Sequence, residues 1–163
     1  PVNLGGVAGG SKFVVGGIVF KFAVDSVVYR SLNDVSGDEE LFWMYGGRAG
    51  RNDGGAIKAA GLELCHIEHV ISAYLEDLRY PLMCLVDFKG FRVIALSMLP
   101  ISNDTLCYGS NDAGRTVHKD DERLSNLLEE LFHQRLNLEP HKICSSDKVL
   151  SGPGDAEGHV GED

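Results

Sequence analysis

Residues Gly109–Thr116, with the sequence GSNDAGRT, differ by one residue from the phosphate-binding P-loop pattern G-x-x-x-x-G-K-[ST]. A P-loop holds phosphates with backbone N–H groups at the start of a helix and with the compact ammonium of its lysine. Here Arg115 takes the place of the lysine, and the next helical pattern begins only near residue 121. The sequence therefore predicts a structural turn between two strands. The residues expected to form this turn are Asn111, Asp112 and Gly114.

The same turn gives three local expectations. Gly114 is expected to have a positive φ, which costs a residue with a Cβ roughly 1–2 kcal/mol. Asp112 is expected to accept backbone hydrogen bonds within the turn. Arg115 is expected to pair with a protein carboxylate rather than with a phosphate.

A second arrangement that could carry chemistry combines a strand lysine with a helix glutamate. A glycine hairpin precedes the strand that contains Lys21, and Glu63 follows at the margin of the apolar face of a helix. Protein kinases place these parts in the same order, and their lysine–glutamate pair holds the nucleotide phosphates. The sequence contains neither an H-R-D-like loop nor a D-F-G motif. A kinase-like nucleotide-binding core, possibly inactive in catalysis, is the alternative hypothesis. Otherwise Lys21 simply extends its apolar stem along the strand.

Two histidines, His66 and His69, are three residues apart and could supply two metal ligands. No third histidine, cysteine or carboxylate has a suitable spacing, so we expect neither a metal nor another cofactor. At about 100° per residue, both imidazoles fall on the solvent-facing side of their helix. The four cysteines show no C-x-x-C spacing and are expected to be free, buried thiols in a reducing compartment.

Two amphipathic helices are expected to position these residues. Apolar residues recur every three or four positions over residues 55–78, which predicts the first helix. The second is predicted over residues 121–137, with an aspartate at position 120 or 121 as its N-cap. A capping-box pattern that begins at Ser36 predicts a further short helix before Gly46. The glycine-rich stretch 46–55 is expected to be a mobile loop.

The remaining segments indicate antiparallel strands. Glycines 16 and 17 separate two short strands, and residues 82–98 form a hairpin in which Gly90 supplies a positive φ. Both arms of this hairpin are nearly continuous in apolar residues, which predicts a strand pair covered on both faces. Further strands are expected on either side of GSNDAGRT and within residues 141–150. The predicted fold is α+β, with antiparallel hairpins packed against two helices and with the 55–78 helix on the 82–98 hairpin.

The chain has 163 residues, enough for one core of ordinary size. Residues 1–10 are expected to be a flexible glycine-rich lead-in, residues 11–150 an α+β domain, and residues 151–163 an acidic glycine-rich tail without a closing element. We expect the chain to be part of a larger domain. No apolar run reaches the roughly 18 residues of a membrane helix. The net charge of -9 excludes a generic DNA binder, because such a surface needs clustered lysine and arginine.

Three motifs between residues 82 and 143 read VDFKGFRVIALSMLP, YGSNDAGRTV and LNLEPHKI. They resemble the central domain of the clustered-mitochondria (Clu) family, in which a VDYRGYRV hairpin is followed by YGS-D-GKTV and later by LKILPHRV. In that family the near-P-loop is a structural turn. The residues that match the first two motifs include Asp87, Gly90, Arg92, Tyr108, Gly109, Ser110, Asp112, Gly114, Arg115 and Thr116.

The resemblance implies a function without catalysis by this segment. It implies a scaffolding or interaction module of a large cytoplasmic protein that acts in mitochondrial distribution and binds messenger RNA for mitochondrial proteins. The expected partners are other protein chains or other domains of the same protein, with messenger RNA bound through the longer protein. Insertion into a membrane is not expected.

Overall fold

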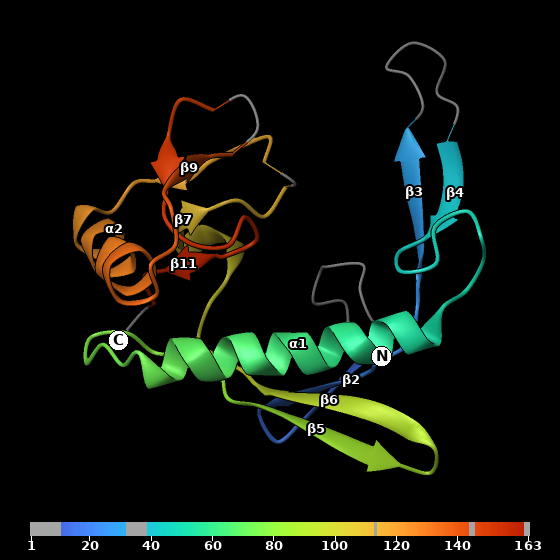
Figure 1. Ribbon diagram of the computed structural model, residues 1–163. Helices are drawn as coiled ribbons and strands as arrows, with labels where there is room; N and C mark the ends of the chain where they lie inside the picture. The colour runs from blue at the N-terminus through green and yellow to red at the C-terminus, as the bar shows by residue number, and fades with distance from the viewer. Residues whose placement is uncertain (1–10, 32–38, 113, 144–145, 162–163) are drawn as a thin grey trace. The chain divides into compact units, whose positions relative to one another are not determined.

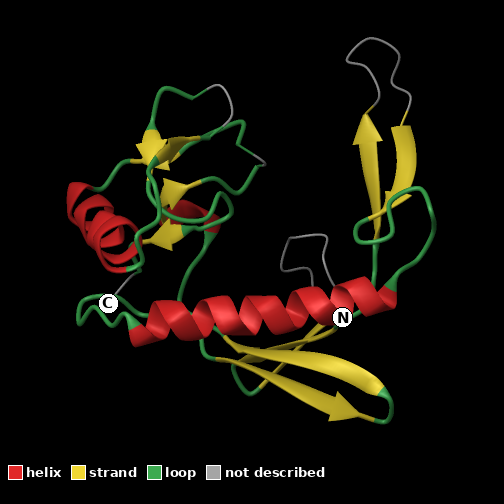
Figure 2. Ribbon diagram, viewed as in Figure 1, coloured by secondary structure: helices red, strands yellow, loops and turns green. Residues whose placement is uncertain are grey.

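The computed structural model describes residues 11–31, 39–112, 114–143 and 146–161. They form two compact units. The first contains the described residues up to Ile67 together with Pro81–Met98, and the second contains Glu68–Tyr80 and the described residues from Leu99 onward. Helices and antiparallel strands are both present, which confirms the predicted α+β class (Figure 2).

The first unit is built on a four-stranded antiparallel sheet with the order β1-β2-β6-β5. Helix α1, Asp53–Ser72, lies along one face of this sheet (Figure 1). Both hairpins of the sheet close through two residues with positive φ, as type I′ turns require. Gly90 has the positive φ that the sequence predicted, at 82°. The strands are β1 (Lys12–Val15), β2 (Ile18–Phe22), β5 (Met83–Phe88) and β6 (Phe91–Ser97).

The core of the first unit lies between α1 and the sheet. Ala60 of α1 is buried against Ala23 and Ile94. Around these residues pack Ile57, Met83 and Leu85. The predicted packing of the helix on the 82–98 hairpin is therefore confirmed.

The prediction that this hairpin is covered on both faces is wrong for the described part of the chain. Along β5, Met83 and Leu85 turn toward α1, whereas Cys84, Val86 and Phe88 are exposed. Successive side chains of a strand point to opposite faces, and α1 can cover only one of them. Among the described residues no second layer packs on the other face. The expected burial of the thiols is therefore wrong for Cys84, and also for Cys65, which is exposed on α1.

Helix α1 ends six residues before the predicted limit. The apolar spacing continues to Leu78, but Tyr74 has a φ of 28° and the chain leaves the helix after Ser72. Leu75 and Leu78 instead contribute to the core of the second unit. His66 and His69 are exposed, as expected for the solvent-facing side of the helix.

The first unit also contains the antiparallel pair β3 (Val27–Ser31) and β4 (Glu39–Trp43). The sequence predicted a short helix here from a capping box at Ser36, which lies outside the described residues. The segment 39–43 is a strand instead, because pairing with β3 offers its backbone and apolar side chains a partner that outweighs a local cap signal.

The second unit packs α2 against a three-stranded sheet with the order β11-β7-β8. Asp121 is the N-cap of α2, and its carboxylate accepts a hydrogen bond from the N–H of Leu124 at 2.6 Å. The helical elements are α2 (Glu122–Glu129) and the π-helical segment Glu130–Arg135 that continues it. The strands are β7 (Leu106–Gly109), β8 (His118–Lys119), β9 (His141–Lys142), β10 (Val149–Leu150) and β11 (Gly158–His159).

Two of these strands refine the expectations for the end of the chain. The segment 141–150 forms a hairpin of β9 and β10 rather than one strand. The expected absence of a regular element after residue 150 is corrected by β11, which pairs with β7. Tyr108 of β7 and Leu131 are the most buried large side chains, at 2% and 0% exposure, and lie in the core of this unit.

Candidate functional site

The structure brings Lys21 and Glu63 together on the face of the sheet that carries α1. The lysine Nζ lies 4.0 Å from the glutamate Oε2. The Lys21 side chain is 19% exposed and that of Glu63 is 46% exposed, so the pair lies at the edge of the helix–sheet contact. A pair at this distance and exposure contributes at most about 1 kcal/mol to stability.

The space beside this pair is too small for a phosphate. The cavity lined by Lys21, Glu63, Tyr45 and neighbouring alanines has a volume of about 10 Å³. A single water needs roughly 10–15 Å³ of such volume. The two side chains that could have held a nucleotide therefore neutralise each other in a closed contact.

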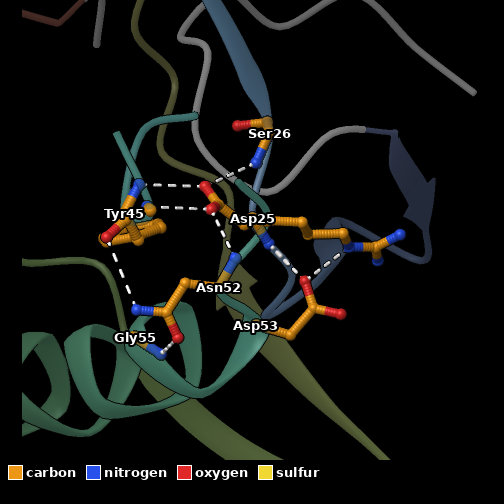
Figure 3. A network of polar contacts seen from close by, with 8 residues as sticks. Asp25, Ser26, Tyr45, Asn52, Asp53 and Gly55 are labelled. Carbon is orange, nitrogen blue, oxygen red and sulfur yellow. Dashed lines mark hydrogen bonds and ion pairs between the residues drawn. The ribbon is translucent and has the colours of Figure 1, made fainter. Parts of the chain in front are cut away.

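Close to this pair, four backbone N–H groups converge on one point, as they do in sites that bind anions (Figure 3). The carboxylate of Asp25 occupies that point. It accepts hydrogen bonds from Ser26 at 2.9 Å, Tyr45 at 2.9 Å, Gly46 at 3.1 Å and Asn52 at 2.9 Å. We call this arrangement the Asp25 cradle.

The side chain in the cradle is buried, since Asp25 is only 5% exposed. Burial by itself would raise the pKa of this carboxyl, but the four N–H donors lower it, and the net pKa lies below its usual value. The group is ionised at neutral pH and has no free acceptor direction for a substrate proton. It serves as a structural anion rather than as a general base.

The cradle also fixes the start of α1. The N–H of Asp25 donates to the Asp53 carboxylate at 2.9 Å, and Arg51 donates to the same oxygen at 2.8 Å. The Asn52 side chain accepts from the N–H of Gly55 at 2.9 Å, which caps the first turn. The stretch 46–55, expected to be a mobile loop, is therefore held by side-chain acceptors.

The GSNDAGRT segment lies in the second unit, between β7 and β8, and its polar atoms bond to each other. The Ser110 hydroxyl donates to Asp112 at 2.9 Å and accepts from the N–H of Gly114 at 2.9 Å. Asp112 also accepts from the N–H of Thr116 at 2.8 Å. These bonds lower the pKa of the Asp112 carboxyl to about 2, the N–H of Thr116 contributing most. Gly114 has a φ of 81°.

Arg115 behaves differently from the sequence expectation. Its side chain is exposed, and within the described residues it forms no ion pair with a carboxylate. The backbone N–H of Arg115 points toward Asp112, which leaves the guanidinium on the solvent side of the turn. In a P-loop, these N–H groups would donate hydrogen bonds to the phosphates. Here they donate to Ser110 and Asp112 instead.

Tyr108 and Gly109 join the turn to the last part of the chain. The Tyr108 hydroxyl donates to the carbonyl of Ser151 at 3.0 Å and accepts from its N–H at 2.6 Å. Burial raises the pKa of this phenol. Gly109 has a φ of 94°, and a Cβ there would lie 2.1 Å from the carbonyl oxygen of Ala156. Both residues therefore have packing roles within the second unit.

Asp87 and Arg92 face each other across the β5–β6 hairpin. The guanidinium donates from Nε to Oδ1 at 2.8 Å and from Nη2 to Oδ2 at 2.9 Å, in a bidentate pair. The hydrogen bond from Arg92 lowers the pKa of the Asp87 carboxyl. Both groups are turned to the α1 side of the sheet, where they reinforce the hairpin register.

No cluster of three or more potential metal ligands occurs in the part of the chain that the structure describes. No helix within those residues is long and apolar enough to cross a membrane.

The face of the β1-β2-β6-β5 sheet opposite α1 is its most unusual surface. Strand alternation and cross-strand register place apolar side chains from all four strands on it, and most are exposed. Phe22 and Phe91 are in edge-to-face contact, with ring centroids 5.6 Å apart. We call this surface the open face. Its exposed members are Phe13, Val15, Ile18, Phe22, Cys84, Val86, Phe88 and Phe91.

Sequence reasoning missed both the cradle and the open face. Asp25 lies three residues after the end of β2 and precedes a serine, a pattern too common to indicate a buried anion. The open face had a clearer signal, because strict alternation along β1 and β2 places Phe13, Phe20 and Phe22 on one side. The nearly continuous apolar run of residues 82–98 concealed it.

Replacing Asp25 tests the cradle. Asp25→Ala leaves four backbone donors without their acceptor and is expected to lower the free energy of unfolding by at least about 2 kcal/mol. The native pKa is depressed, so this stabilisation is complete above the unfolded pKa and is lost as the pH falls through the native pKa. Urea unfolding from pH 7 to 3 should show the deficit shrinking on acidification. Asp104→Ala, at an exposed position, is the control, and an equal effect there would contradict the assignment.

Replacing Gly109 tests the close contact beside GSNDAGRT. Gly109→Ala combines a positive φ with a contact of 2.1 Å, and we expect it to destabilise the second unit by more than about 2 kcal/mol. Gly154→Ala has open space and an ordinary φ, so its stability should match the wild type. Amide hydrogen exchange of residues 106–109 measures both variants. Equal protection in the two would show that the contact is unimportant.

Two named proteins are similar to about half of this chain. A Caenorhabditis elegans protein named clustered mitochondria protein homolog is 33% identical over 92 residues, which is 50% of this chain and 7% of that protein. An Arabidopsis thaliana protein named clustered mitochondria protein is 29% identical over 89 residues, which is 50% of this chain and 6% of that protein. The chain thus covers only a small part of these relatives. No solved structure matches it.

The family comparison covers far more of the chain than these two alignments. The family described as "Clustered mitochondria" matches residues 1–163, so the match includes both structural units. This confirms the resemblance found in the sequence motifs. The chain belongs to the clustered-mitochondria family.

Proposed function

We propose that this chain is a non-catalytic interaction module of a longer cytoplasmic protein that controls the distribution of mitochondria. The observation that carries the proposal is the open face, an apolar sheet surface that no described element covers. Two relatives of this chain are named clustered mitochondria proteins, and these names indicate the cellular process. The expected partners are other protein chains or other domains of the longer protein.

The size of the open face supports this role. Its four exposed phenylalanines, Phe13, Phe22, Phe88 and Phe91, retain between 36% and 59% of their accessible surface. With roughly 200 Å² for a fully exposed phenylalanine, they alone leave on the order of 400 Å² in contact with water. The largest apolar patch of an ordinary monomer is about 300–600 Å², and patches of that size often mark interaction sites.

Association with messenger RNA belongs, in this proposal, to the longer protein and not to this chain. The chain has a net charge of -9, with 24 acidic and 15 basic side chains. Binding to the phosphate backbone requires clustered lysine and arginine. The exposed apolar face therefore suits a protein partner better than a nucleic acid.

A nucleotide-binding function has less support. Lys21 and Glu63 are close, as the kinase-like alternative requires, but the adjacent cavity of about 10 Å³ has no room for a phosphate. The near-P-loop donors are bonded within their own turn. Both candidate phosphate sites are therefore filled by protein groups.

A thermal-shift titration with ATP and magnesium separates the two functions. We expect no increase in the melting temperature at millimolar ATP, in the wild type or in Lys21→Ala. A ligand at 100 times its dissociation constant would stabilise the protein by about 2.7 kcal/mol, which such a titration detects. Lys58→Ala, an exposed lysine of α1, is the control. Stabilisation that disappears only in Lys21→Ala would favour the nucleotide-binding function.

Mitochondrial distribution in cells tests the interaction module. Cells express the longer protein only in a form that carries both Phe88→Asp and Phe91→Asp. Their mitochondria are then imaged by fluorescence microscopy. We expect mitochondria to cluster although the protein level is unchanged. Leu41→Asp and Leu62→Asp alter leucines of similar exposure, 53% and 51%, outside the open face, and should leave the distribution normal. A normal distribution with the phenylalanine variants would contradict the proposal.

A further inference from the structure

We propose that the open face binds the open face of a second copy of this chain, so that two sheets pack face to face around a two-fold axis. This inference rests on the proposed function, since it names the partner of the interaction module. Sheet-on-sheet packing of this kind places apolar side chains of two sheets about 10 Å apart in one layer. A two-fold contact uses the same patch on both copies.

The charge distribution on the four strands fits a second copy. Each strand contains one charged residue, namely Lys12, Lys21, Asp87 and Arg92. The cross-strand register puts all four on the α1 side of the sheet. The open face therefore has no charged side chain within its strands. Near a two-fold axis any charge would face its own copy, and this face is free of that repulsion.

The lack of charge within the strands argues against a partner chosen by charge. The net charge of -9 opposes the approach of two copies, so burial of the open face must outweigh a repulsion that salt screens. A basic or acidic partner would find no complementary charge within the strands of the open face. A second copy needs none, because apolar burial is non-directional and independent of charge.

The area of the open face supplies most of what a standard dimer interface buries. Together with the four phenylalanines, Val15, Ile18 and Val86 bring the exposed apolar surface to on the order of 600 Å². A standard interface buries about 800 Å² on each partner. The apolar centre thus supplies about three quarters of this area, and residues at the margins of the sheet supply the rest. The ammonium of Lys89, 5.4 Å from the Phe88 ring centroid, lies at this margin.

Sedimentation equilibrium of the 163-residue chain tests the dimer. From about 1 to 200 μM we expect a reversible monomer–dimer equilibrium, with at least tenfold weaker association for Val86→Lys. Leu62→Lys, which changes a leucine of similar exposure on α1, should associate like the wild type. Raising the salt concentration should strengthen the dimer, because it screens repulsion between two chains of charge -9. Monomers throughout this range, or dimers unaffected by Val86→Lys, would overturn the proposal.

The wild-type chain offers a measurement that does not depend on a folded variant. Cys84 is exposed on the open face, and Cys65 is exposed on α1. Alkylation of each thiol is followed by mass spectrometry at low and high protein concentration. The dimer predicts that only Cys84 becomes slower at high concentration, and equal slowing or none at all would count against it. If these tests fail while the phenylalanine variants still disturb mitochondria, the face binds another protein and only this inference is lost.

Discussion

The buried carboxylate of Asp25 is the interaction on which the first unit depends. It joins the end of β2 to the chain after β4 and to the N-cap of α1, three segments distant in sequence. A buried charge is costly unless every acceptor direction is used, and here four N–H donors meet that condition. This anchor fixes the position at which α1 starts. The contact between Lys21 and Glu63 then follows from the position of α1.

Among the described residues of the first unit, α1 is the one helix, and this explains why the sheet has one dry face and one open face. α1 meets the strands through Ala60, which is buried against Ala23 and Ile94. An antiparallel sheet of soluble proteins commonly pairs such a covered face with a polar one. Here the uncovered face is aromatic and aliphatic instead. That departure is the most distinctive feature of the first unit.

Three places in the molecule resemble anion sites, and in each the protein supplies its own anion or acceptor. The Asp25 carboxylate fills the first cradle. In GSNDAGRT, the oxygens of Ser110 and Asp112 accept from the turn N–H groups that a phosphate would need. Beside α1, the carboxylate of Glu63 approaches Lys21. A short motif can therefore match a ligand-site pattern because its donors are the same, although the acceptor is a protein group rather than a ligand.

The α+β class, the family and the packing of the first helix on the 82–98 hairpin could all be predicted from the sequence. The positive φ of Gly90 and Gly114 could be predicted as well. Periodicity and turn chemistry are local properties, so they can be read without the tertiary structure. Tertiary structure decided what depends on contacts distant in sequence. It ended α1 at Ser72 although the apolar spacing continues, and it paired 39–43 with β3 against a helix signal. It also placed four donors around Asp25, and within the described part of the chain it left one sheet face without a covering layer. An apolar run records that burial is favourable, but only the number of elements that pack on a sheet determines which of its faces is buried.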